Sequence, residues 1–187
     1  TRDSTPVFSI LVYLVIRFLH PYTFYIIYAL LLGLFLTSLT GILRTQHAVS
    51  LRTGLVQVGL LFALHSAALR FVLSRIPGDR WEYLLEAGFA GQRLLGPVLQ
   101  PSSFGVLLLV SIFAYLRRRP VGAVLLAVLA ATVHPTYLLS AASLTLAYMI
   151  GSLMEERTLR KPLTIGMAAM AAVLPVLAYT LISFSPT

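Results

Sequence analysis

Long apolar runs separated by short basic turns dominate this chain, and they constrain its fold more than any other feature. An α-helix needs about 20 apolar residues to cross the hydrocarbon core of a bilayer. The chain is 58% hydrophobic and 11% charged, whereas a soluble domain has roughly 25% charged residues. A soluble helical bundle would also need polar helix faces, which most of these runs lack. The sequence therefore predicts an all-α, polytopic membrane protein.

Hydropathy divides the chain into seven apolar segments. They are Val7–Leu19, Tyr22–Leu43, Thr53–Leu73, Pro101–Leu116, Pro120–Val133, Pro135–Met154 and Pro162–Phe184. The first is too short to span a membrane comfortably and contains Arg17, so we expect it to lie in the membrane interface, as amphipathic helices do. We expect one transmembrane domain over residues 1–187, with about six spanning helices and one or two interfacial helices, some of them short or broken.

Prolines are expected to begin four of these helices. Proline suits the first helical turn, where its missing N–H would have no partner. It also disfavours helical geometry in the residue before it. The helix boundaries are therefore expected at the residues that precede the prolines: Gln100, Arg119, His134 and Lys161.

The boundary at His134 decides the topology. A continuous helix from Pro120 to Met154 would be roughly 50 Å long, more than a hydrocarbon core of about 30 Å. If the chain instead reverses before Pro135, the basic turns Arg44–Arg52, Arg117–Arg119 and Glu155–Lys161 lie on one side. The positive-inside rule favours this reversal and makes that side cytoplasmic.

The net charge of +8 comes from 13 arginines and one lysine, and these lie mostly between the apolar runs. Nucleic-acid surfaces interleave basic and aromatic residues, a pattern that is missing here, so we expect no nucleic-acid partner. The chain contains no cysteine, which excludes disulfides, thiolate metal sites and a cysteine nucleophile.

The reversal places the polar stretch 74–100 and the His134 junction on the non-cytoplasmic side. "DRWEYLLEAGF" is typical of an interfacial helix, whereas "GQRLLGPVLQPSS" is broken by glycine and proline. Irregular backbone at membrane depth is tolerated where it lines a cavity, so this stretch is expected to form a cavity lip. The candidate substrate- or lipid-binding residues are Arg75, Gln92, Arg93, Gln100, His134 and Tyr137.

Each candidate has a simpler structural interpretation. The 74–100 stretch can be an ordinary interfacial loop whose Arg93 touches lipid phosphate. His134 can be a helix-junction residue, and Tyr137 an interfacial anchor. Ser102 and Ser103, near a helix start, would add hydroxyl and N–H donors for an anion.

His65 is an ionisable residue inside an apolar run, where such groups often mark function. It can be a packed neutral histidine, a member of a proton relay, or an axial ligand to haem or chlorophyll. The common hydrolase, metalloprotease and phosphate-loop motifs are missing from the sequence, so no catalytic residue is assigned.

Three stretches, "GQRLLGPVLQPSSFGVLLL", "RRRP" and "LAATVHPTYLL", resemble a group of uncharacterised bacterial polytopic membrane proteins with a GT-C-like architecture. The resemblance covers roughly Pro6 to Met154. GT-C glycosyltransferases use a sugar donor linked to a polyprenyl phosphate, and their catalytic acid lies in the first outer loop. The resemblance implies that this chain begins after that loop, as a fragment of a longer protein in the bacterial inner membrane.

Two functions follow as expectations. The first is a GT-C-like integral membrane protein that binds a polyprenyl-phosphate-linked sugar or another anionic lipid, with a divalent metal implied if it is a glycosyltransferase. The alternative is a non-catalytic accessory subunit of a larger photosynthetic or respiratory membrane complex, the only case in which His65 would hold a pigment or haem. Membrane lipids are partners in both.

Overall fold

The computed structural model describes residues 4–47, 50–64, 75 and 99–184. The α-helices there are α1 (Pro6–Phe18), α2 (Thr23–His47), α3 (Leu51–Leu64), α6 (Val106–Leu116), α7 (Pro120–Val133), α8 (Leu138–Glu156) and α9 (Arg160–Phe184). Two short 3-10 helices, η2 (Pro101–Gly105) and η3 (Pro135–Tyr137), precede α6 and α8. No strand occurs in this described part, and the all-α prediction is confirmed.

Three helical stretches are long and apolar enough to cross a membrane: Thr23–Thr45, Pro135–Glu156 and Arg160–Tyr179. The helices Pro6–Phe18, Pro101–Leu116 and Pro120–Val133 are apolar but shorter. The 14 residues of α7 extend roughly 21 Å, less than a core of about 30 Å. The described helices thus support a membrane protein, with three candidate spans.

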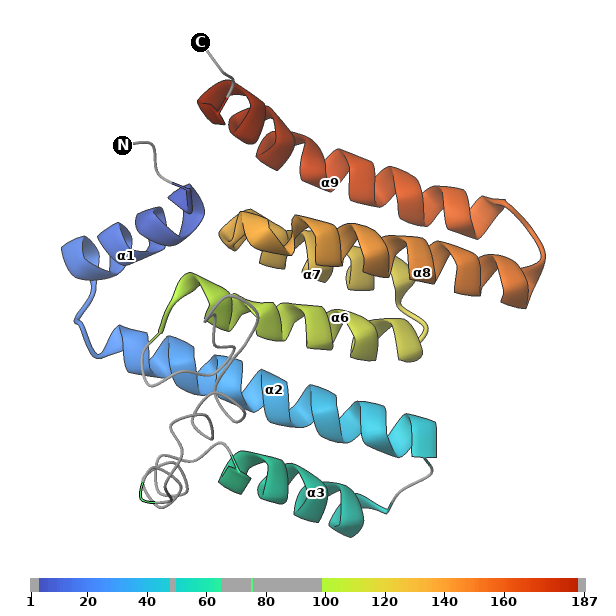
Figure 1. Cartoon of the computed structure of the whole chain (residues 1–187), viewed down its shortest axis with the longest axis horizontal. Helices are drawn as coiled ribbons and strands as arrows, with labels where there is room; N and C mark the ends of the chain where they lie inside the picture. Colours follow the sequence, from blue (N-terminus) through green and yellow to red (C-terminus); the bar gives the residue numbers. More distant parts are fainter. Residues whose placement is uncertain (1–3, 48–49, 65–74, 76–98, 185–187) are drawn as a thin grey trace.

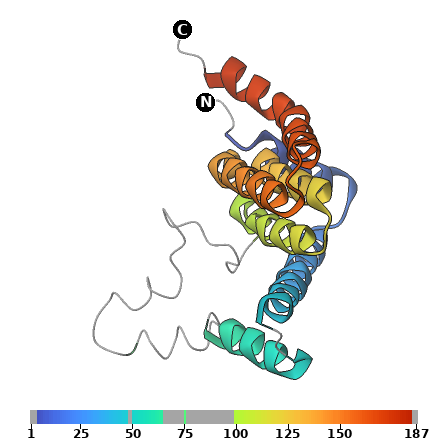
Figure 2. The same cartoon turned by 90° about the vertical axis from the view of Figure 1, so that its right-hand side faces the viewer.

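The long helices lie side by side in a row (Figure 1). In Figure 2 the row is seen from the helix ends: α9 lies at one edge, followed by the α7–α8 pair, α6, α2 and finally α3. The neighbouring pairs in this row are also the pairs in contact. Helix α1 lies at the end of the row where α7 and α8 join, and contacts α7.

The predicted reversal before Pro135 is confirmed. Helix α7 ends at Val133, His134 is extended (φ −137°, ψ 101°), and α8 runs back along α7. Helix starts follow Gln100, Arg119 and His134 as predicted. The fourth boundary differs by two residues, because α9 begins at Arg160 and has Pro162 as its third residue.

The helix termini form two opposite ends of the fold. We call the one that holds the turns Arg117–Arg119 and Arg157–Leu159 the basic end; it lies on the right in Figure 1. Arg118 forms an ion pair with Glu155, and Lys161 forms one with Glu156. Thr45, near the end of α2, lines the same small pocket as Arg118 and Lys161. The basic turns after α2, α6 and α8 therefore gather at one end, as expected.

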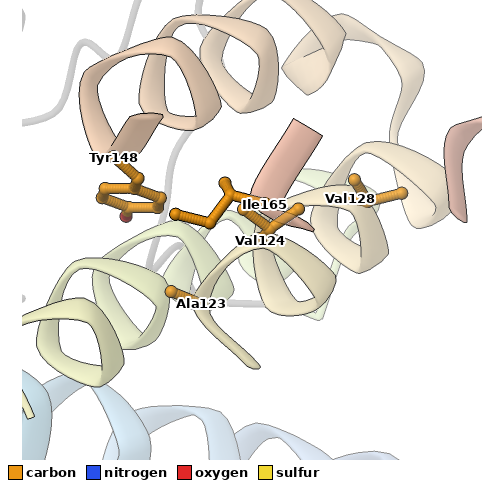
Figure 3. Close-up of a cluster of buried hydrophobic side chains, with 5 residues drawn as sticks. All are labelled: Ala123, Val124, Val128, Tyr148 and Ile165. Carbon is orange, nitrogen blue, oxygen red and sulfur yellow. The ribbon is translucent and has the colours of Figure 1, made fainter. Parts of the chain in front are cut away.

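Helix α7 is the centre of the fold. Its fully buried residues Ala123 and Val124 form a cluster with Val128, Tyr148 of α8 and Ile165 of α9. Figure 3 shows Ile165 beside Val124, with the ring of Tyr148 next to them. A second cluster further along α7 consists of Ala127, Ala131 and Ala141. Small side chains let helices approach closely where lipid provides no hydrophobic driving force.

A buried polar network joins α6 to α8. The hydroxyls of Ser111 and Tyr148 lie 2.8 Å apart, and the rings of Tyr148 and Tyr115 stack with centroids 4.4 Å apart. The Tyr115 hydroxyl donates to the Tyr148 carbonyl at 3.4 Å and lies 3.5 Å from the Ser152 hydroxyl. Polar side chains inside apolar helices commonly bond across helices in this way.

Candidate functional site

The end of the row opposite the basic end holds η2, η3 and the α1–α2 connection (Figure 1). We call it the His134 end. The chain meets it at two proline-started turns, Gln100–Pro101 and His134–Pro135, because each proline keeps the residue before it out of helical geometry. The candidate residues Gln100, His134 and Tyr137 belong to these two turns.

Gln100 caps η2. Its backbone N–H donates to the Ser103 hydroxyl at 3.3 Å, and its side chain accepts from the Ser103 backbone N–H. That N–H also donates to the Gln100 carbonyl at 2.9 Å. Ser103 is fully buried and its polar groups serve this cap, so the expectation that it offers an N–H to an anion is wrong. Such reciprocal bonds satisfy donors at a helix start.

A hydrogen bond from Tyr137 connects η3 to η2. Its hydroxyl donates to the Ser102 carbonyl at 2.8 Å, and its ring meets the His134 ring edge-on with centroids 5.4 Å apart. Tyr137 is half-buried, so it is more than the membrane-surface anchor that was its simpler interpretation. The bond also places His134 and Tyr137 at the same end of the fold as Gln100.

Burial lowers the pKa of His134 from its ordinary value of 6.5. Desolvation disfavours the charged imidazolium, so burial favours the neutral form of His134. A neutral imidazole can donate one hydrogen bond and accept another. It cannot neutralise a phosphate, so a cation would have to come from elsewhere.

The remaining candidates are described less fully. Arg75 is exposed in a turn. Gln92, Arg93 and His65 lie outside the described residues, as does most of the 74–100 stretch with its expected interfacial helix. Of the expected cavity lip, the structure therefore describes the part contributed by Gln100 and η2.

An apolar groove of about 720 Å³ runs between α8 and α9 and is floored by Val128 of α7. Small residues such as Ala142 and Gly166 leave space for this groove. Leu138 and Leu177 line the part of it nearest the His134 end. Its one hydroxyl, on Thr145, donates to the Ala141 carbonyl at 2.8 Å. The groove thus offers a hydrocarbon surface with no unmet polar group in its lining. Sequence analysis missed it, because it depends on which helices are neighbours.

Helix α9 diverges from α8 toward the His134 end (Figure 1). Leu138 is the first residue of α8 and directly follows Tyr137. The groove lining on α8 extends from Leu138 to Met149, roughly 16 Å at 1.5 Å per residue. That length is about half of a 30 Å hydrocarbon core.

Within residues 4–47, 50–64, 75 and 99–184, no three histidine or acidic side chains gather as metal ligands. Comparisons with family models, with curated proteins and with solved structures found no match to this chain.

Proposed function

We propose that this chain is an integral membrane protein of about six spanning segments that binds an anionic lipid, such as a polyprenyl-phosphate-linked sugar, at its His134 end. In this proposal the basic end faces the cytoplasm of a bacterial inner membrane. The GT-C-like resemblance of the sequence first suggested the ligand class. The observation that carries the proposal is the apolar groove, whose lining reaches Leu138, the residue after Tyr137.

The groove supports a lipid chain as the occupant. Its lining is hydrocarbon and it lies between two helices long enough to span a membrane. An apolar chain in contact with Leu, Met and Ala side chains leaves no polar group without a partner. The head of the lipid would then lie beside His134 and Tyr137, at the depth where η2 and η3 supply polar backbone.

Neutral and charged residues would contact different parts of the lipid head. The neutral imidazole of His134 suits a sugar hydroxyl or a phosphate oxygen. The phosphate charge requires a cation, and we assign it to Arg93 with Arg75. Gln92 would contact sugar, while Gln100, which caps η2, holds that turn in place. Transfer of the sugar would need a catalytic acid or base from residues other than these.

The test uses the purified full chain in detergent, titrated with a polyprenyl monophosphate and followed by native mass spectrometry. Ala142→Phe places a ring in the groove and should displace roughly two methylenes of the lipid chain, worth about 1.6 kcal/mol. We expect binding about tenfold weaker. Ala147→Phe is the matched control, because Ala147 is exposed on α8 but does not line the groove.

Two further variants test the head of the lipid. His134→Ala and Arg93→Ala should weaken retention of the polyprenyl phosphate and leave retention of the uncharged polyprenol nearly unchanged. Equal binding by the wild type, Ala142→Phe and Arg93→Ala would overturn the proposal. Co-migration with a large complex on a native gel, with no lipid retained, would instead favour the accessory-subunit function.

A further inference from the structure

A second pocket, of about 290 Å³, lies at the basic end. Five helices or their turns meet there. The lining residues are Thr45, Tyr115, Leu116, Arg118, Pro120, Ser152, Glu155 and Lys161. Two cations and three hydroxyls therefore share one hollow at the ends of the spanning helices.

The charge around this pocket is unbalanced. In the described part of the chain, two carboxylates lie at the basic end and each is paired with one cation, Glu155 with Arg118 and Glu156 with Lys161. Among the residues that the structure describes, six more arginines flank the pocket turns without an ion pair: Arg44, Arg52, Arg117, Arg119, Arg157 and Arg160. A pocket lined by cations within such an excess attracts an anion.

The backbone adds an independent observation. Arg118 (φ 61°) and Arg157 (φ 53°) are the non-glycine residues with positive φ in the described part of the chain. Left-handed backbone favours glycine, because a Cβ in this conformation is strained. The positive-inside rule depends on the number of basic residues in a loop. The neighbouring arginines would satisfy it even if glycine replaced Arg118 and Arg157. Of these two residues, Arg118 lines the pocket.

We propose that this pocket binds the phosphate of an anionic phospholipid headgroup from the leaflet at the basic end. Basic pockets between the ends of membrane helices suit such headgroups. Lys161 and Arg118 would meet the phosphate, and the hydroxyl of Ser152 would donate to one of its oxygens or to glycerol. Glu155 also lines the pocket. Its carboxylate repels the anion and competes with it for Arg118, so Glu155 lowers the affinity of the pocket for the phosphate.

The test measures retention of phosphatidylglycerol by the purified full chain in detergent, using native mass spectrometry, with phosphatidylcholine, a zwitterion of zero net charge, as the comparison. Lys161→Gln should lower phosphatidylglycerol retention at least fivefold. Glu155→Gln should raise it, because it removes the repulsion and frees Arg118. A misfolded variant would retain more of both lipids or less of both, so a gain for phosphatidylglycerol with phosphatidylcholine unchanged protects the test from a folding defect.

Arg17→Gln is the matched control: it changes the net charge as Lys161→Gln does, but lies on α1 at the His134 end. It should retain phosphatidylglycerol like the wild type. Ala147→Phe, which lines neither this pocket nor the groove, should do so as well. Equal losses in Arg17→Gln and Lys161→Gln, or a loss in Glu155→Gln, would overturn the proposal. Displacement of the lipid by glycerol 3-phosphate at equal concentration would also overturn it, since a small soluble phosphate would then be the ligand.

Discussion

Arg118 and Glu155 form an ion pair across the basic end, although 37 residues separate them in the sequence. Arg118 precedes α7 and Glu155 lies in the last turn of α8. The contact is possible only if α7 and α8 are antiparallel, with the reversal at His134. The polar turns η2 and η3 then share the opposite end.

The pair itself should contribute little to stability. Both side chains are substantially exposed, at 69% and 45%, and exposed ion pairs typically contribute about 0–1 kcal/mol. A double-mutant cycle with Arg118→Gln and Glu155→Gln should therefore give a coupling below about 1 kcal/mol. A coupling of several kcal/mol would mean that the pair is far more buried than this geometry shows.

The polar network between α6 and α8 should contribute more to stability than the ion pair between Arg118 and Glu155. Tyr148→Phe removes the hydroxyl that bonds to Ser111 and keeps the ring stacked on Tyr115. Interhelical hydrogen bonds in membrane proteins contribute about 0.6 kcal/mol on average and up to roughly 1.7. Unfolding in mixed micelles should show a loss in this range for Tyr148→Phe, with little further loss when Ser111→Ala is added. Fully additive losses would show that the two hydroxyls do not interact.

Gly41 is a position of close approach between α2 and α6. A Cβ there would lie 2.3 Å from Cε2 of Phe113, so this ring would have to move. Gly41→Ala should destabilise the fold by about 1–3 kcal/mol through overpacking. Gly33→Ala is the matched control in the same helix, because its Cβ meets nothing within 4 Å; it should be neutral or stabilising by up to roughly 1 kcal/mol. The same loss in both variants would contradict the contact.

Protonation of His134 should destabilise the fold. Its pKa is lowered by burial from 6.5, so the unfolded chain binds a proton more readily than the folded chain. Stability is therefore fully present above about pH 6.5 and declines as the pH falls through the folded-state pKa. The thermal midpoint of the wild type should fall between pH 7 and pH 5 more steeply than that of His134→Gln. Tyr137→Phe, which keeps the imidazole, should retain the wild-type slope; identical slopes in all three proteins would refute this role for His134.

Much of the helix plan follows from local rules in the sequence. Proline at position 120 or 135 ends one element and begins the next for steric reasons, so the bounds of α7 were predictable to the residue. The gathering of the basic turns at one end was predictable, because these turns follow alternate helices. The boundary at Lys161 was wrong by two residues, because Pro162 is tolerated inside the first turn of α9.

The packing around α7 was not predictable in the same way. Its residues are apolar on every side, so hydropathy does not show which face meets α6, α8 or α9. The bond between Ser111 and Tyr148, and the groove floored by Val128, depend on that rotation. The alanines at 127, 130 and 131 were the available signal, because small residues mark close helix contacts.

The capping of η2 by Gln100 was missed for a different reason. A capping box usually has serine or threonine at the N-cap and glutamate or glutamine three residues later, whereas here glutamine precedes and serine follows. The chemistry is the same, with the two residues exchanged. Gln100 was therefore expected to contact a ligand, although its side chain is engaged with the Ser103 backbone.

The reversal at His134 is tested most directly by labelling, and the chain's lack of cysteine provides a clean background. Single variants Arg117→Cys, Arg160→Cys and Thr136→Cys would be placed in sealed membrane vesicles and treated with a membrane-impermeant maleimide. We predict that the cysteines at 117 and 160 react from the same side of the membrane, and the cysteine at 136 from the other. Labelling of 117 and 160 from opposite sides would contradict the reversal and the arrangement of both proposed sites.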